Sequence, residues 1–121
     1  MQTNPALNVA QPELDLILAL LAKRLADATV LAFGSRVRDW PYGRGSKPYS
    51  DLDLAVWPAK ANDSGPALSL ALALAELRAD FEDSALPWRV DVSLAQDLPV
   101  ALRQMARQHG VELQRATESS H

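Results

Sequence analysis

Three aspartates in this sequence have the residue type and spacing to do chemistry together. Asp51 and Asp53 stand one residue apart in SDLDLAVW, and Asp91 stands in the similar segment WRVDVSL. Side chains of a strand alternate between its faces, so Asp51 and Asp53 would share one face with their Cα atoms about 7 Å apart. Two like charges that close favour a cation between them, and Mg²⁺ prefers carboxylate oxygens. If the two strands are neighbours, Asp91 joins the same site.

A Gly-Ser pair ends the apolar run that precedes these aspartates. Gly34 would let the backbone approach a phosphate closely, and Ser35 would begin a short helix whose N–H groups and hydroxyl bind pyrophosphate. Three carboxylates can hold two metal ions that stabilise the attacking and leaving oxygens of nucleotidyl transfer. Alone, an Asp-x-Asp pair is more often a solvated strand face, and a Gly-Ser pair is usually a turn. Their joint order along the chain favours a site.

The elements that would position these residues follow from hydrophobic spacing and from glycine and proline. Helices are predicted over about 12–27, 66–81 and 99–109, with Ser64 as an N-cap candidate and a turn of helix after Ser35. Strands are predicted over 29–33, 51–57 and 88–94, with 111–115 as an ambiguous edge strand. This order predicts an α/β (α+β) fold, in which helices flank a small mixed sheet of three to four strands.

Length and composition indicate an ordinary globular protein. The 121 residues are expected to form a single domain with a frayed N-terminus over about 1–10 and a tail over about 116–121. A net charge of −3 argues against general nucleic-acid binding. The uncharged run over 16–22 is too short to cross a membrane. No cysteine is present, and no convincing signal peptide opens the chain, so a cytoplasmic location is expected.

The segments GSR, SDLDLAV and RVDV resemble the signature of the nucleotidyltransferase superfamily of the DNA polymerase β type. The resemblance covers residues 29–94, and the small size is similar to the minimal branch, which includes the antitoxins of MntA/HepT pairs. It implies a nucleotidyltransferase fold with two Mg²⁺ ions and ATP as substrate. The catalytic, metal-binding residues it implies are Asp51, Asp53 and Asp91, with Asp91 also acting on the hydroxyl nucleophile.

The same resemblance implies that Gly34 and Ser35 hold the triphosphate of the incoming nucleotide. Arg36 would bind the nucleotide with them, or it is a plain surface arginine. The chain departs from the minimal pattern in the loop that follows: 15 residues separate the Gly-Ser pair from Asp51, more than minimal members often have. Asp39 also stands where a glycine is expected.

The loop 36–50 carries four basic residues against one acid, interleaved with Trp40, Tyr42 and Tyr49. Such a segment could stack on a base, contact a triphosphate or dock a partner, because arginine and aromatic residues concentrate at interface centres. A plain surface loop whose aromatic side chains pack locally is the alternative.

Larger nucleotidyltransferases add a domain that holds the second substrate, for which no room is expected in this chain. A partner chain or a second copy of this chain would then present the nucleophile, and the resemblance implies a small all-helical, HepT-like protein. The expected function is transfer of AMP from ATP to a hydroxyl of that partner, with tyrosine as a candidate, by an antitoxin that neutralises a toxin. Two alternatives stay open: a binding module that neutralises a partner without catalysis, and a transferase acting on a small molecule.

Overall fold

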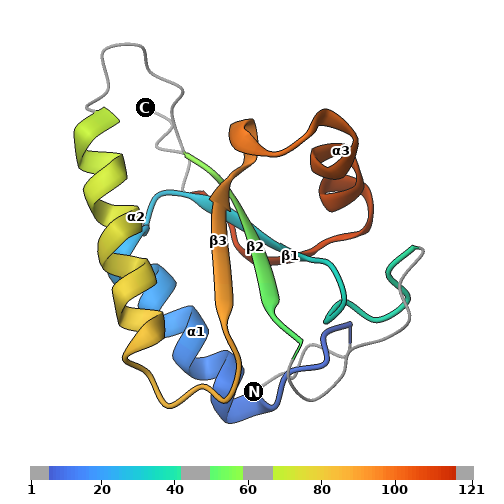
Figure 1. Ribbon diagram of the computed structural model, residues 1–121, viewed down its shortest axis with the longest axis horizontal. Helices are drawn as coiled ribbons and strands as arrows, with labels where there is room; N and C mark the ends of the chain where they lie inside the picture. Colours follow the sequence, from blue (N-terminus) through green and yellow to red (C-terminus); the bar gives the residue numbers. More distant parts are fainter. Residues whose placement is uncertain (1–5, 42–49, 59–66, 117–121) are drawn as a thin grey trace.

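The computed structural model describes residues 6–41, 50–58 and 67–116. Figure 1 shows their arrangement. In chain order they form α1 (Gln11–Arg24), β1 (Thr29–Phe33), β2 (Leu52–Trp57), α2 (Ala67–Glu82), β3 (Val90–Leu94), the 3₁₀ helix η1 (Ala95–Asp97), α3 (Val100–His109) and β4 (Val111–Gln114).

The strands form one mixed sheet with the order β3-β2-β1-β4. β1 pairs antiparallel with β2 and with β4, whereas β2 and β3 are parallel. The parallel pair is joined by the crossover that contains α2, as parallel neighbours require. The predicted α/β (α+β) class with a small mixed sheet flanked by helices is confirmed, and the ambiguous last segment is indeed an edge strand.

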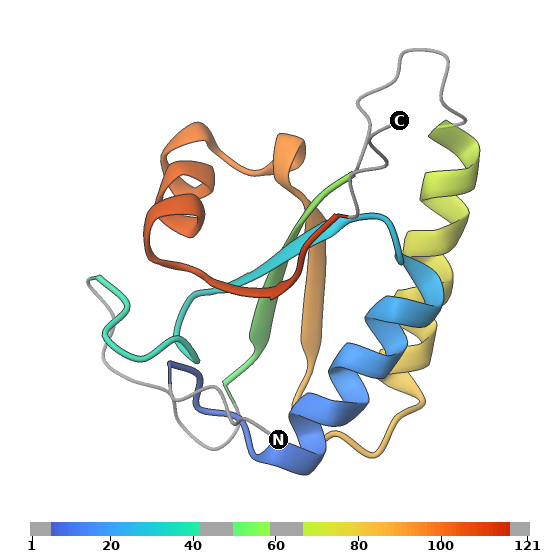
Figure 2. The same ribbon diagram turned by 180° about the vertical axis from the view of Figure 1, so that it is seen from behind.

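The helices divide between the two faces of the sheet (Figures 1 and 2). α1 and α2 cover one face, where Leu52, Leu54 and Val56 of β2 are each 0% exposed within the main hydrophobic core. α3 covers part of the other face through a smaller cluster that contains Phe33 and Ala55. Because strand side chains alternate, Asp53 shares the α3 face with Ala55. Asp53 therefore lies on the face opposite the main core.

Segment boundaries differ from the sequence predictions by a few residues. α1 ends at Arg24 rather than near 27, because Leu25 leaves the helical region with φ −134° and ψ 49°. β3 begins at Val90 rather than 88. The predicted N-cap Ser64 lies outside the described residues. None of the described helices is long and apolar enough to cross a membrane.

The chain just before α1 packs against the segment after β1. Leu7 is 3% exposed and forms an isolated β-bridge with Val37. The Asn8 N–H donates to the Arg36 carbonyl at 2.8 Å, and the Arg38 N–H donates to the Ala6 carbonyl at 2.7 Å. Residues 6–10 fall within the stretch expected to be frayed, yet they form this pairing and support the loop that leads to the candidate site.

Candidate active site

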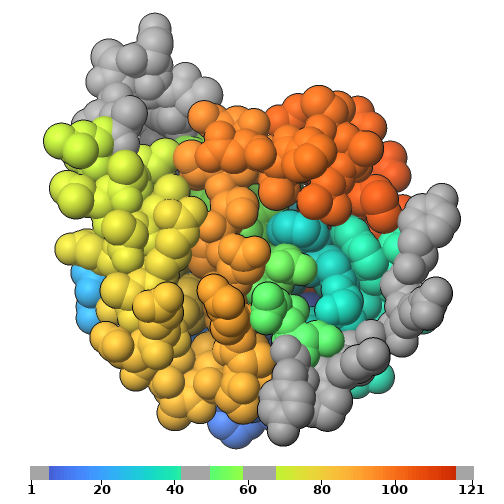
Figure 3. Space-filling view, viewed as in Figure 1, coloured from blue at the N-terminus to red at the C-terminus, as the bar shows by residue number. Residues whose placement is uncertain are grey.

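Two of the predicted aspartates stand side by side in the sheet. The β2–β3 register pairs Asp53 with Asp91, and the β1–β2 register pairs Asp53 with Phe33. Residues paired in register share a face of the sheet, so one row runs from Phe33 through Asp53 to Asp91. Asp91 was expected to join the site only if the two aspartate-bearing strands are neighbours, and β2 and β3 are neighbours. Figure 3 shows this face, with β2 atoms in green between β3 in orange and the segment after β1 in teal.

Among the described carboxylates, Asp53 is the one whose pKa is clearly raised by its surroundings. Its pKa is raised to about 6, first by burial and then by the negative charges of Asp91 and Asp51. Asp53 is half-buried, whereas Asp51 and Asp91 are exposed. The three acids therefore interact electrostatically as one group, with Asp53 at its centre, and a bound cation would relieve the repulsion.

Gly34 lies directly against Asp53. It has a φ of +87°, in the left-handed region that favours glycine, and a Cβ built there would lie 2.5 Å from Asp53 Oδ2. A side chain at position 34 would therefore force both a strained backbone and a displaced carboxylate. Gly34 thus brings the Gly-Ser turn against the acidic row, and the predicted approach of its backbone to a phosphate stays a prediction.

Gly34→Ala is expected to reduce activity more than stability. The left-handed φ costs on the order of 1–3 kcal/mol for a non-glycine residue, and the new methyl group must push Asp53 out of line with Asp91. The rate of the predicted nucleotidyl transfer and the thermal unfolding temperature, measured on the same preparation, check this.

Gly110→Ala is a matched control, because its methyl group would meet the Ala106 and Ala32 carbonyl oxygens and no carboxylate. It is expected to destabilise the protein while the folded fraction stays active. Equal loss of activity per folded molecule in the two variants would contradict the role given to Gly34.

Ser35 begins a series of turns, so the predicted turn of helix after it is wrong. The Val37 N–H donates to the Gly34 carbonyl at 3.0 Å, and the Trp40 N–H donates to the Val37 carbonyl at 3.3 Å. Between them, Val37 is drawn into its bridge with Leu7, which interrupts helical winding. Ser35 itself is half-buried beside Gly34, and its predicted role in nucleotide binding stays a prediction.

Asp39 explains why a glycine is expected in this turn. Its φ is +61°, a left-handed conformation that glycine adopts readily and that aspartate tolerates better than most residues. The departure from the minimal pattern at this position therefore keeps the backbone conformation that a glycine would provide.

Arg36 is buried rather than displayed toward a ligand. It is 6% exposed, and its guanidinium donates to the Ser50 carbonyl at 2.9 Å and the Asn8 carbonyl at 2.8 Å. The guanidinium carbon also lies 4.3 Å from the centroid of the Trp88 ring. Burial lowers the Arg36 pKa, although Glu13 and Asp51 act in the opposite direction. The structure thus buries Arg36 between two backbone carbonyls and the Trp88 ring.

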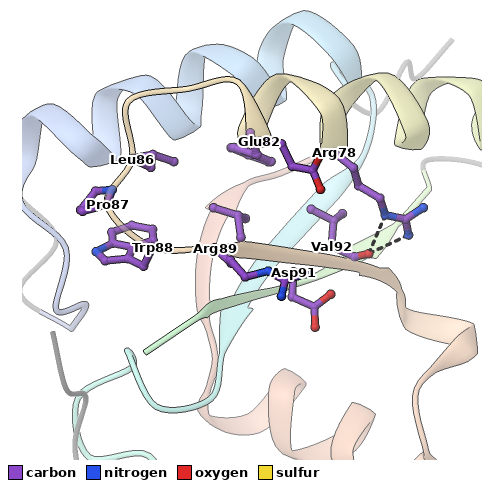
Figure 4. A pocket seen from close by; sticks show the side chains of 10 residues that line it. Arg78, Glu82, Leu86, Pro87, Trp88, Arg89, Asp91 and Val92 are labelled. Carbon is purple, nitrogen blue, oxygen red and sulfur yellow. Dashed lines mark hydrogen bonds between the residues drawn. The ribbon is translucent and has the colours of Figure 1, made fainter. Parts of the chain in front are cut away.

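A groove of about 380 Å³ lies between α2, the segment 86–89 and β3. Asp91 is among its lining residues, although the Asp91 carboxylate points away from α2 (Figure 4). Arg78 of α2 lines this groove and donates to the Val92 carbonyl through Nε and Nη2, at 3.2 and 2.7 Å. Arg89 also lines the groove. The sequence analysis did not identify these two arginines. The two-residue spacing of Arg89 and Asp91 could have indicated Arg89, because it places both on one face of an extended segment.

The predicted metal ligands fit Mg²⁺ by chemistry, since all three are carboxylates. Asp53 and Asp91 share one face of the sheet, and Asp51 directly precedes β2. Their side chains do not form a compact cluster: within 6–41, 50–58 and 67–116, no three acidic or histidine side chains make a group that could hold a metal ion. Binding would therefore need side-chain movement at Asp51, Asp53 or Asp91, and their roles as metal ligands stay predictions.

The aromatic loop is described only in part. Trp40 packs beside Phe33, with ring centroids 6.2 Å apart, and meets His109 edge-on at 6.4 Å. It thereby joins the turn after β1 to the end of α3. The predicted roles of Tyr42 and Tyr49 in stacking or docking lie outside the described residues.

A comparison with known proteins identifies a relative of similar sequence. The chain is 40% identical over 86 residues to a Haemophilus influenzae protein named "Probable protein adenylyltransferase MntA". This similarity supports a nucleotidyltransferase family. The four-stranded mixed sheet with its flanking helices is consistent with the nucleotidyltransferase fold. The alignment covers 71% of this chain and 65% of that relative, so the chain spans less than two thirds of the relative's length. No family model matches the chain.

Proposed function

We propose that this chain is a Mg²⁺-dependent nucleotidyltransferase that transfers AMP from ATP to a hydroxyl group of a partner protein. The observation that carries the proposal is the position of Asp53, which is paired with Asp91 in the sheet, contacted by Gly34 and raised in pKa to about 6. A carboxylate whose pKa is raised by burial and by neighbouring negative charges is typical of functional sites. The similarity to a protein named as a probable protein adenylyltransferase supports the same reaction.

In this proposal Asp51, Asp53 and Asp91 would hold the Mg²⁺ ions, which when bound neutralise charge on the triphosphate. The acceptor oxygen forms a bond to the α-phosphorus of ATP while the bond from that phosphorus to its bridging oxygen breaks, and pyrophosphate leaves with the electron pair. Asp91, exposed on an edge strand, accepts the proton of the attacking hydroxyl. The Gly34-Ser35 backbone lines the triphosphate.

The acceptor in this proposal is a small helical protein of the HepT type, and the modified group is a hydroxyl with tyrosine as the candidate. The chain would then be an antitoxin that neutralises its partner by covalent AMP transfer. The exposed position of Asp91 on the edge strand β3 supports a macromolecular acceptor, because a protein side chain can approach it from outside the sheet edge.

Incubation with α-labelled ATP, Mg²⁺ and the product of the neighbouring gene tests the proposal. Label is expected on the partner with wild-type protein and with Asp27→Asn, a control at an exposed aspartate remote in sequence from the acidic strands. Asp91→Asn is expected to lower the rate about 100-fold or more, because it removes the proton acceptor and a proposed metal ligand. Absence of label with the wild-type protein, or full labelling by Asp91→Asn, would contradict the proposal.

A second candidate function is a binding module that neutralises its partner without transfer. The observation that favours it is the spread of the acidic side chains, none of which forms a metal-binding cluster within the described residues. Neutralisation of the partner by Asp51→Ala and Asp53→Ala separates the two functions. A module that only binds keeps neutralising when these carboxylates are removed, whereas a transferase loses that effect.

A further inference from the structure

Arg36 connects the starts of the two acid-bearing strands. The Ser50 carbonyl that it binds immediately precedes Asp51. The Trp88 ring that it stacks on stands three residues before Asp91. Arg36 itself follows the Gly34-Ser35 pair. The buried Arg36 side chain therefore contacts the segments that lead into Asp51 and Asp91, and its own backbone directly follows Gly34 and Ser35.

These contacts meet where the β2–β3 pairing begins. The Leu52 N–H donates to the Arg89 carbonyl at 2.9 Å, so the residues after Ser50 and Trp88 enter the sheet together. Among the strands that the structure describes, β3 lies at the edge of the sheet and pairs with β2 alone. The position of Asp91 relative to Asp51 thus depends on what holds the start of β3 against the start of β2. Arg36 does so by contacting both Ser50 and Trp88.

A guanidinium suits this bridge better than other cations. Its planar fork donates in fixed directions to two carbonyls while its flat face stacks on an aromatic ring, which the compact ammonium of lysine cannot do. The Asn8 N–H also donates to the Arg36 carbonyl, so backbone and side chain together fix the residue. A 6% exposure and two bonds to main-chain carbonyls do not suit direct contact with a nucleotide.

We infer that Arg36 is a positioning residue, which sets the separation of Asp51 from Asp91 by holding Ser50 and Trp88 together. The inference rests on the proposed function, since it treats these aspartates as parts of one site. It replaces direct nucleotide binding by Arg36 with an effect exerted through the backbone.

Arg36→Lys is the central test, because it keeps the charge and removes the fork. Arg38→Lys is the matched control, an exposed arginine two residues later in the same turn. In amide NMR spectra, Arg36→Lys is expected to shift the signals of Asp51 and Asp91 and leave those of β4 unchanged. Its Mn²⁺ affinity, measured with the metal alone, is expected to fall about 10-fold, as is typical when a residue that orients a ligand is changed.

The kinetic pattern distinguishes positioning from nucleotide contact. Arg36→Lys is expected to lower kcat about 10-fold while the KM for ATP stays within about threefold. A raised KM with unchanged kcat would overturn the inference, and so would unshifted signals at Asp51 and Asp91 in a folded variant. If Arg36→Lys does not fold, Trp88→Phe takes its place and is expected to shift the Asp91 signal.

Failure of the inference and failure of the proposed function are distinguishable. A wild-type protein that transfers no AMP would contradict the proposed function. The NMR comparison would still be readable in that case, because it requires neither metal nor substrate. Shifts at Asp51 and Asp91 would support the positioning role, and their absence would overturn it.

Discussion

Asp53→Asn is expected to lower the rate of AMP transfer about 10³-fold or more, which corresponds to a loss of about 4 kcal/mol of transition-state stabilisation. Asparagine keeps the size of the side chain and removes its charge. The negative charges of Asp91 and Asp51 both act on Asp53, and Gly34 lies against its carboxylate. No neighbouring carboxylate can therefore replace it. Initial rates of label transfer to the partner, with saturating ATP and Mg²⁺, measure the effect.

The control for this prediction is Asp27→Asn, which removes the charge of an exposed aspartate after α1 and is expected to keep the wild-type rate. A rate for Asp53→Asn within about tenfold of wild type would be too small a loss for a metal-binding carboxylate. Such a result would contradict the proposed role of Asp53 as a metal ligand.

The same substitution is expected to stabilise the protein without metal above pH 6. The pKa of Asp53 is about 6 in the folded protein and about 3.9 in an unfolded chain. Between these values the folded state holds a proton that the unfolded state has lost, so the contribution of Asp53 to stability falls as pH rises from about 4 to 6. After a discount for partial exposure, the loss is on the order of 2 kcal/mol.

Urea unfolding of wild-type protein and Asp53→Asn at several pH values measures this effect, with the metal removed by a chelator. The two proteins are expected to differ little near pH 4, while the variant should be more stable by on the order of 2 kcal/mol at pH 7. Addition of Mg²⁺ is expected to reduce the difference in unfolding free energy between the two proteins, because Mg²⁺ binding stabilises the folded wild-type protein. A variant that is less stable than wild type at pH 7 without metal would show that Asp53 is not under the predicted repulsion.

Local sequence patterns were sufficient to predict much of the fold. The alternation in SDLDLAVW and WRVDVSL located β2 and β3 within two residues, because a strand with one buried face repeats every second residue. Local patterns also predicted that Gly34 follows β1 and that Asp51 and Asp53 stand at the start of β2. The juxtaposition of Asp53 and Asp91 required one further assumption, that β2 and β3 are neighbours, and the register confirms it.

Contacts between segments far apart in sequence were the part that local patterns could not supply. Arg36 was expected to bind the nucleotide or to lie on the surface. The surface position is wrong, because Arg36 is buried against Asn8 and Ser50, which are 28 and 14 residues away, and nucleotide binding by Arg36 stays a prediction. The turn after Ser35 was expected to be helical, but the distant bridge from Leu7 to Val37 determines its course. In both cases tertiary hydrogen bonds override local preference.

Paramagnetic broadening by Mn²⁺ in the presence of ATP tests most directly whether the Gly-Ser turn and the acidic strands form one metal and nucleotide site. At substoichiometric Mn²⁺, the amide signals of Gly34, Ser35, Asp53 and Asp91 are expected to broaden together and saturably, while those of β4 stay sharp. Equal broadening at exposed acids elsewhere, such as Asp83, or broadening of the acidic strands without the Gly-Ser turn, would contradict a single site.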